Sequence, residues 1–442
     1  MLKNILLVTP LNLLGRAGVF LIYVVLANWF GDTAEMDFIY YYWGIAVFLI
    51  GLLSSASAYS VLVPLLAEAR EKGVTAAQLC VQSIFHRYIR MMPWGCGLLV
   101  ATTWGISQLF FPNAGLTLTT IFGIVVGFYI FTVIASIRWM LKAVLDTYHV
   151  FHFPLIVQCL SSILVITIIF LSKEYISWYS IPLALIIGEL FQTIVLLFRC
   201  GVVLELPFYN LFYLPKKVRD TDTIAYATQF LRQTLMMMGA AISDGLNPVV
   251  DRGMASSLGP GSVSKLDYAL RLGAIPETLT SGAMPVLLSH WAKVFSSKDE
   301  TQLKQSVWRG VAVVIVLMVP LLVGLYIFRT NIVRIFYGHG KLSLDGQLHI
   351  ASLFGIFLIG TLPRLISRLL IRAHLASQNH NKVVTATLIR LVFNPICNWL
   401  FMRYWGLEGI AWSTTILSYP ILAYIAVEFW RNAKPAKNTQ DG

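Results

Sequence analysis

Charged residues are scarce in this chain of 442 residues. Only 12% of its residues are Asp, Glu, Lys or Arg, about half of the roughly 25% usual in soluble proteins. Hydrophobic residues make up 57%, and the mean hydropathy is +0.73. This composition is typical of an integral membrane protein and argues against a chain of soluble domains.

Cysteine and metal-binding patterns are also sparse. The five cysteines are scattered, form no CxxC and are odd in number, and the eight histidines form no HExxH. The glycine-punctuated segment "IFYGHGKL" (335–342) lacks GxxxxGK[ST] and is therefore not a P-loop. We expect no disulfide framework, no metal, no cofactor and no enzymatic activity.

Long apolar stretches predict an all-α integral membrane fold with about twelve transmembrane helices, since each span needs about 20 apolar residues. The first stretch is longer than the apolar core of a signal peptide, about 7–15 residues, so we expect a span rather than a cleaved leader. The predicted spans are 5–30, 36–67, 84–111, 118–147, 154–172, 179–200, 222–256, 265–294, 305–328, 347–373, 383–404 and 407–430.

The distribution of lysine and arginine predicts the orientation. With the N-terminus inside, the cytoplasmic segments hold 19 of these residues and the external segments hold 6. The positive-inside rule therefore predicts that both termini are cytoplasmic. Basic loops facing anionic membrane lipids account for the net charge of +12, so no nucleic-acid partner is expected.

A long polar connection divides the spans into two sets of six. We expect an N-terminal lobe at 1–203, a cytoplasmic linker at 204–223, a C-terminal lobe at 224–430 and a cytoplasmic tail at 431–442. The segments "LANWFG" (26–31) and "MASSLG" (254–259) are weakly similar, and each precedes an aspartate early in the next helix, Asp37 or Asp267. This similarity indicates a parallel repeat about an axis along the membrane normal.

Some arginines lie inside the predicted spans, where a charge at the bilayer centre costs about 2.5–3.5 kcal/mol. Arginines near the ends of spans can extend their charged groups to the membrane interface. Three other arginines lie deeper and are harder to explain in this way. Arg16 lies about 17 Å along its helix, near the midplane, and either pairs with a carboxylate on another helix or faces a wet cavity. Arg390 precedes Asn394 by four residues, beside the kink that Pro395 predicts.

The third is Arg271, in a charged stretch at 251–279 around a Gly-Pro-Gly turn. Asp267 lies four residues before it on the same helix face, which would allow a local ion pair. Asp244 and Asp251 also share a face, whereas Arg252 points elsewhere. These charges form either a solvated hairpin or one side of a polar cavity between two helix bundles.

Four segments of the chain, in the same order as in a known family, carry a resemblance. "VVDRGMASSLGPGSVSKLDYALRLGAIP" (249–276) is similar to the seventh-to-eighth helix signature of the MurJ (MviN) lipid II flippases, within the MOP superfamily of flippases and exporters, and "RIFYGHGKL" (334–342) to the segment after their ninth helix. The start, "NLLGRAGVFLIYVVLANWFGDTAEMDFIY" (12–40), and residues 368–416 resemble their first and their tenth-to-twelfth helices. The similarity is patchy from about 84 to 215.

The resemblance implies a V-shaped bundle of two six-helix lobes with a cationic central cavity, located in the bacterial cytoplasmic membrane. Such a protein moves an undecaprenyl-diphosphate-linked glycan precursor to the outer leaflet by alternating access. We expect it to act as a monomer among membrane lipids. The sequence does not distinguish whether transport is coupled to protons, to sodium ions or to the membrane potential.

Only some of the family's functional residues occur at the matching positions of this sequence. Arg16 and Arg271 match two of its cavity arginines, and Asp37 matches its acidic residue after the first helix. A second first-helix arginine is replaced by Ile22, and "FLIGLLSSAS" (48–57) has no basic residue where the family's second helix has one. Many members also have two further spans that line a groove for the lipid tail.

These departures keep other functions open. A flippase for a surface-polysaccharide or O-antigen repeat unit would bind the same diphosphate and polyprenyl anchor. A cation-coupled multidrug exporter is disfavoured, because the charge at Arg16 has the wrong sign for cationic drugs. A membrane-bound glycan ligase or polymerase would usually need a larger external loop, and a non-transporting scaffold is the remaining possibility.

Overall fold

The regular elements of the protein are all helices. The computed structural model describes residues 2–55, 58–110, 118–213, 221–281, 300–376 and 380–432, and no strand occurs among them. In hydrocarbon every backbone donor and acceptor must be satisfied internally, which a helix achieves within one segment. The predicted all-helical fold is confirmed.

Seven helical stretches of the described residues are long and apolar enough to cross a membrane. Two of them, His152–Val203 and Asn381–Arg431, contain 52 and 51 residues, more than twice the length that one span needs. Each is interrupted by a residue with positive φ, Ser177 (47°) or Gly406 (55°). Each stretch therefore holds two spans, as the hydropathy pattern predicts.

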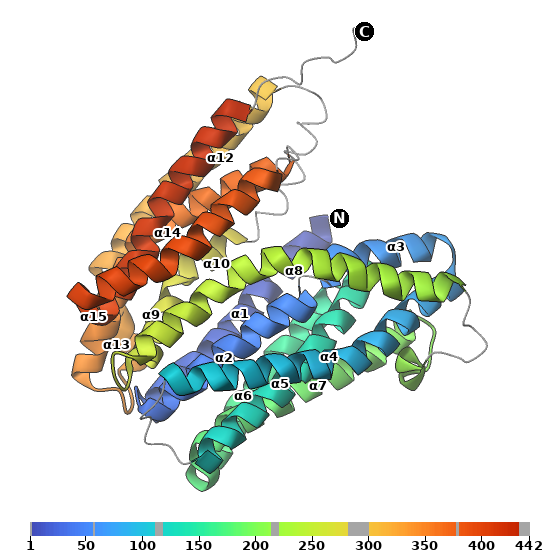
Figure 1. Ribbon diagram of the computed structural model, residues 1–442, viewed down its shortest axis with the longest axis horizontal. Helices are drawn as coiled ribbons and strands as arrows, with labels where there is room; N and C mark the ends of the chain where they lie inside the picture. Colours follow the sequence, from blue (N-terminus) through green and yellow to red (C-terminus); the bar gives the residue numbers. More distant parts are fainter. Residues whose placement is uncertain are drawn as a thin grey trace. The chain divides into compact units, whose positions relative to one another are not determined.

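Contacts divide the chain into two compact units, and unit 1 comprises residues 1–26 and 33–260. Two short π-helical segments, η1 and η2, continue α2 toward α3, and η3 and η4 are 3₁₀ turns. The elements are α1 (Leu2–Phe30), α2 (Ala34–Ile50), η1 (Gly51–Ser55), η2 (Ala58–Leu62), α3 (Val63–Glu71), α4 (Val74–Phe110), α5 (Leu118–Thr147), α6 (His152–Ile176), η3 (Ser177–Tyr179), α7 (Ser180–Val203), η4 (Phe208–Phe212) and α8 (Thr221–Ser256) (Figure 1).

The interior of unit 1 is apolar where α4, α5, α7 and α8 meet. Phe85, Met140, Leu196 and Phe230 belong to one buried cluster there. Polar side chains tie the helix ends beside this cluster to neighbouring turns. Gln78 Nε2 donates to the carbonyl of Leu204 at 2.8 Å, which fixes the start of α4 against the end of α7.

Unit 2 comprises residues 27–32 and 261–442. Its long helix α14 packs against α9, α12, α13 and α15, so it forms the middle of the unit (Figure 1). Asn28, in the short N-terminal segment, is held by Nδ2 donating to the carbonyl of Phe336 at 2.7 Å. The elements are α9 (Ser262–Gly273), α10 (Ile275–Ser281), α12 (Glu300–Ile327), α13 (Arg329–Tyr337), α14 (Leu344–Ala376) and α15 (His380–Asn432).

The contact boundary at Pro260 lies beyond the predicted linker at 204–223. The reason is that α8 packs against α2 and α4 and so joins the first unit. The two functional lobes at 1–203 and 224–430 stay a prediction. Residues 214–220 of the predicted linker, 433–442 of the tail and 282–294 of the eighth span lie outside the described residues.

The end of α7 generates a stability prediction. Glu205 has a φ of 54°, and Leu206 N–H and Glu205 N–H donate to the carbonyls of Gly201 and Val202, which is a Schellman motif. Because glycine adopts this conformation without steric cost, Glu205→Gly should stabilise the fold by about 1 kcal/mol, measured as a higher melting temperature in detergent. The same change at exposed Glu68, inside α3, should lower the melting temperature. A decrease for both variants would contradict the assignment.

Candidate functional site

Arg16 lies in α1 of unit 1 and is exposed. Its Nε donates to Oδ1 of Asn12, one turn earlier, at 3.2 Å. No carboxylate of the described residues lies within ion-pair distance of its guanidinium. Of the two alternatives that the sequence leaves open, pairing with an acid on another helix is therefore not observed in this part of the chain.

Three other predicted site residues of unit 1, Asp37, Asp251 and Arg252, are buried in helices. Asp37 lies in the first turn of α2, where the positive end of the helix dipole stabilises a carboxylate. Asp251 and Arg252 are buried in α8, and Arg252 Nη1 donates to the carbonyl of Pro248 at 3.0 Å. A Cβ at Gly44 of α2 would lie 2.8 Å from that Nη1, so Arg252 reaches α2 because residue 44 is glycine.

Asp244 lies in α8, and its side chain falls outside the described part of the structure. Its predicted position on one face with Asp251 stays a prediction.

In unit 2, Arg271 and Asp267 lie on one face of α9. Arg271 Nη2 is 4.0 Å from Asp267 Oδ1. This distance is at the upper limit for an ion pair and is too long for a hydrogen bond. The side chain of Asp267 is 1% exposed and that of Arg271 is 34% exposed. The local pair compensates the buried carboxylate and leaves part of the guanidinium accessible.

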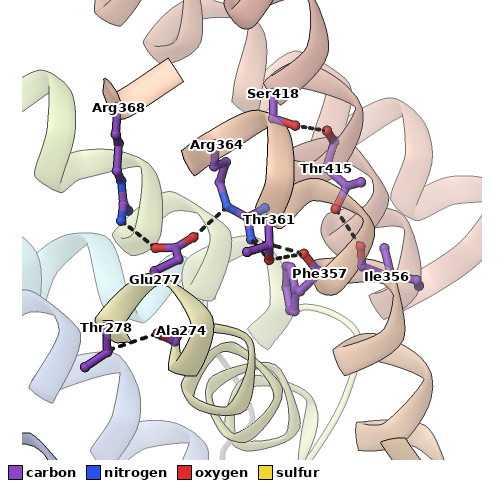
Figure 2. A network of polar contacts seen from close by, with 10 residues as sticks. All are labelled: Ala274, Glu277, Thr278, Ile356, Phe357, Thr361, Arg364, Arg368, Thr415 and Ser418. Atoms are coloured by element: carbon purple, nitrogen blue, oxygen red, sulfur yellow. Dashed lines mark hydrogen bonds and ion pairs between the residues drawn. The ribbon is translucent and has the colours of Figure 1, made fainter. Parts of the chain in front are cut away.

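A stronger ionic network joins α10 to α14 (Figure 2). Glu277 lies between two arginines one turn apart on α14, with Oε1 3.0 Å from Arg364 Nε and Oε2 2.7 Å from Arg368 Nη1. The side chains of Glu277 and Arg364 are 14% and 15% exposed, whereas that of Arg368 is 55% exposed. One carboxylate thus bridges a buried and an accessible guanidinium.

Arg364 is held from several directions. Its Nη2 donates to the carbonyl of Phe357 at 3.1 Å and to Oγ1 of Thr361 at 2.9 Å. Its Nη1 is buried without a hydrogen-bond partner among the described residues. A Cβ at Gly360 would come within 2.6 Å of this Nη1 and within 3.0 Å of the Thr415 backbone, so glycine makes room for both the guanidinium and α15.

Arg390 of α15 is half-buried. It lies near enough to Arg364 for their positive charges to interact, and no described carboxylate pairs with it. We call Glu277, Arg364, Arg368 and Arg390 the arginine cluster. The cluster holds three guanidinium groups and one carboxylate, which binds Arg364 and Arg368, so it has a positive surplus.

Most residues of this cluster were not predicted from the sequence as site residues; only Arg390 was. Arg364 and Arg368 lie within a predicted span but were not selected as site residues. Glu277 was assigned no role. The signal that could have found them is the Arg-xxx-Arg spacing on one helix face with no acid within one turn, which requires a partner from another helix.

The chemistry of these groups favours an anion. Guanidinium groups bind phosphates through charge-assisted and often bidentate hydrogen bonds. Among the described residues no group of three or more His, Cys, Asp or Glu side chains could hold a metal ion.

Comparisons with known proteins find similar proteins over most of the chain. A family model described as lipid II flippase MurJ matches residues 26–440. The lipid II flippase MurJ of Burkholderia cenocepacia is 23% identical over 428 residues, which cover 93% of this chain and 80% of that protein. The probable lipid II flippase MurJ of Buchnera aphidicola subsp. Schizaphis graminum is 20% identical over 440 residues, covering 95% and 81%.

Solved structures show the same fold. A lipid II flippase MurJ in an inward closed conformation has a TM-score of 0.77 and 21% identity, covering 96% of this chain and 87% of that one. An inward-facing multidrug resistance MATE transporter of the MOP superfamily has a TM-score of 0.78 and 11% identity, covering 98% and 96%. The predicted MOP-type architecture is thereby confirmed.

The arginine cluster generates a stability prediction. Glu277→Gln removes the one carboxylate shared by Arg364 and Arg368 and leaves a buried guanidinium without compensation. We expect a loss of about 2–3 kcal/mol, seen as a lower melting temperature in detergent. Adding Arg364→Met to this variant should restore part of the loss, because the uncompensated charge is then removed.

The matched control is Glu68→Gln, which breaks the exposed Glu68–Lys72 pair. It should change stability by less than about 0.5 kcal/mol. Equal effects of the two Glu→Gln changes would show that the bridge contributes nothing beyond a surface pair.

Proposed function

Because the chain belongs to the family of the lipid II flippase MurJ, we propose that it moves lipid II, or a similar polyprenyl-diphosphate-linked glycan precursor, from the cytoplasmic to the outer leaflet of a bacterial membrane. The structural observation that carries the proposal is the surplus of arginine over carboxylate within the helical bundle. A diphosphate cannot cross hydrocarbon alone, and these groups offer it compensating charge.

Each compact unit contributes its own cations. Unit 1 has Arg16, and unit 2 has Arg271 and the arginine cluster. We infer that the polyprenyl tail stays in lipid while the headgroup is transferred, with alternating access produced by movement of the predicted lobe at 1–203 against that at 224–430. Asp37 stays a proposed substrate-binding residue, and Asp251 and Arg252 stay proposed cavity or coupling residues; all three are buried.

A surface-polysaccharide repeat unit is the second candidate substrate. It is favoured by the missing family cation at Ile22, which here is a buried apolar residue. A site with fewer cations tolerates a different headgroup while still binding the diphosphate. Proteoliposomes that contain either labelled lipid would distinguish the two substrates.

A multidrug exporter is disfavoured. The fold match to a MATE transporter is as high as that to MurJ, so architecture does not discriminate between them. Charge does, because arginines repel cationic drugs. The family's activity is transport, which agrees with the expectation that the chain is not an enzyme.

We infer a multi-pass protein of the cytoplasmic membrane with both termini in the cytoplasm, supported by 19 basic residues in the predicted inner segments against 6 in the outer ones. We also propose that one copy suffices for transport. Coupling to protons, sodium or membrane potential needs no bound cofactor.

Two substitutions test the function. Arg16→Ala and Arg271→Ala should each reduce flipping of labelled lipid II in proteoliposomes at least about tenfold, because each removes a charge-assisted contact to the diphosphate. Both variants should elute from size exclusion like the native protein.

Arg403→Ala is the matched control. Arg403 is exposed and lies over the ring of Trp399 at 3.7 Å, away from the predicted site. It should transport normally. Normal flipping by both the Arg16 and Arg271 variants would refute the roles of these arginines, and flipping of neither lipid by the native protein would refute the function.

A further inference from the structure

A polar pocket of about 370 Å³ lies in unit 2, where α12 ends and α13 begins beside α14 and α15. Its lining includes Tyr326, Arg329, Ser352, Glu408 and Trp412. In the predicted orientation this is the external end of the bundle, and none of these residues belongs to the arginine cluster. The volume is within the range of small-molecule sites, roughly 300–1,000 Å³.

The guanidinium of Arg329 is held by one nitrogen and one face. Nη1 donates to the carbonyl of Tyr326 at 2.9 Å, and the group lies over the Tyr326 ring, 4.5 Å from its centroid. Nε and Nη2 donate to no acceptor among the described residues and are not buried. No described carboxylate pairs with Arg329, so two of its donor nitrogens are available to a ligand.

The carboxylate of Glu408 is fixed at one oxygen and accessible at the other. Ser352 Oγ donates to Glu408 Oε1 at 2.6 Å, which connects α14 to α15. Oε2 accepts no hydrogen bond from the described residues and is not buried. No cation among these residues lies within ion-pair distance of Glu408, so Oε2 is a charged acceptor that a ligand can reach.

One turn of α14 lies between the two charged groups. Ser352, which holds Glu408, and Gly355 are three residues apart and therefore neighbours on one helix face. A Cβ at Gly355 would lie 3.0 Å from Cδ and 3.4 Å from Nε of Arg329, so glycine lets Arg329 approach α14 here. The guanidinium and the carboxylate thus flank the same turn without forming an ion pair.

This arrangement favours a ligand that carries both signs of charge. An anion alone would meet the carboxylate of Glu408, and a cation alone would meet the guanidinium of Arg329. In a zwitterion, an anionic group accepts hydrogen bonds from Nε and Nη2 while a primary ammonium group donates to Oε2. Both contacts are charge-assisted hydrogen bonds, which are the strong ones.

The position of the pocket favours a membrane lipid over a soluble zwitterion such as a peptide. The apolar span Lys304–Ile327 ends two residues before Arg329, which places the pocket near the level of lipid headgroups. Tyrosine and tryptophan, which both line the pocket, are typical of this level. Phe328 and Leu348 are exposed beside the charged groups, where acyl chains can cover them.

We propose that this pocket binds the headgroup of phosphatidylethanolamine in the outer leaflet, with the phosphate on Arg329 and the ammonium group on Glu408 Oε2. Phosphatidylcholine has no ammonium N–H to donate, and phosphatidylglycerol has no positive charge, so the pocket discriminates against both. The lipid is a resident ligand and not the transported substrate, so the proposal does not depend on the proposed function.

The binding experiment uses the full chain, delipidated in detergent, and native mass spectrometry with these three phospholipids carrying the same acyl chains. Phosphatidylethanolamine should bind at least about tenfold more tightly than the other two, because only it donates a charge-assisted hydrogen bond to Glu408. Glu408→Gln retains an oxygen for Ser352 and replaces Oε2 by NH₂. It should weaken phosphatidylethanolamine about tenfold and phosphatidylcholine by less than about threefold.

Arg329→Gln removes the contact to the phosphate, which all three lipids share. It should therefore weaken each of them at least about tenfold. The matched controls are Arg334→Gln in α13 and Asp345→Asn in α14, which change exposed charges at the same end of unit 2 outside the pocket lining. Both should bind the three lipids as the native protein does.

Equal binding of the three lipids by the native protein would overturn the proposal, and so would an unchanged preference in Glu408→Gln. Free phosphoethanolamine or the tripeptide Ala-Ala-Ala binding as tightly as the lipid would assign the pocket to a soluble ligand and overturn the lipid assignment. Size exclusion reports whether each variant is folded. If Arg329→Gln does not fold, the nearly isosteric Glu408→Gln decides alone.

Discussion

An ionised group among apolar helices needs a compensating charge or a set of hydrogen bonds, because hydrocarbon solvates neither. The polar architecture of this protein follows from that constraint. Glu277 bridges Arg364 and Arg368, Asp146 is bound by Tyr59 and Lys142, and Arg138 pairs with Glu189 at 2.5 Å. Apart from the Lys142–Asp146 pair within α5, these contacts connect different helical segments, so compensation of charge and packing of helices are satisfied together.

Compensation of charge is incomplete at two arginines on which the proposed function depends. Within the described residues, Arg16 contacts the side-chain amide of Asn12 and no carboxylate, and Arg390 likewise has no carboxylate partner. The positive surplus is what a diphosphate requires.

Family and fold carry different kinds of information about this chain. The match over residues 26–440 identifies the family, whereas one solved flippase and one inward-facing drug exporter fit the backbone about equally well. Function therefore depends on side chains placed on a shared scaffold. The network around Glu277 is one such set of side chains, and the backbone alone does not determine it.

Hydropathy alone predicted a helical membrane protein, its spans and the breaks near residues 177 and 406, because the thickness of hydrocarbon limits helix length. Spacing alone predicted that Asp267 and Arg271 share a face. The partners of Arg364, Arg368 and Asp146 required the tertiary structure. Glu277 lies 87 residues before Arg364, and nearly uniform apolarity around a membrane helix leaves no pattern that tells which face meets which neighbour. Only packing decides how each helix is rotated, and therefore which charges meet.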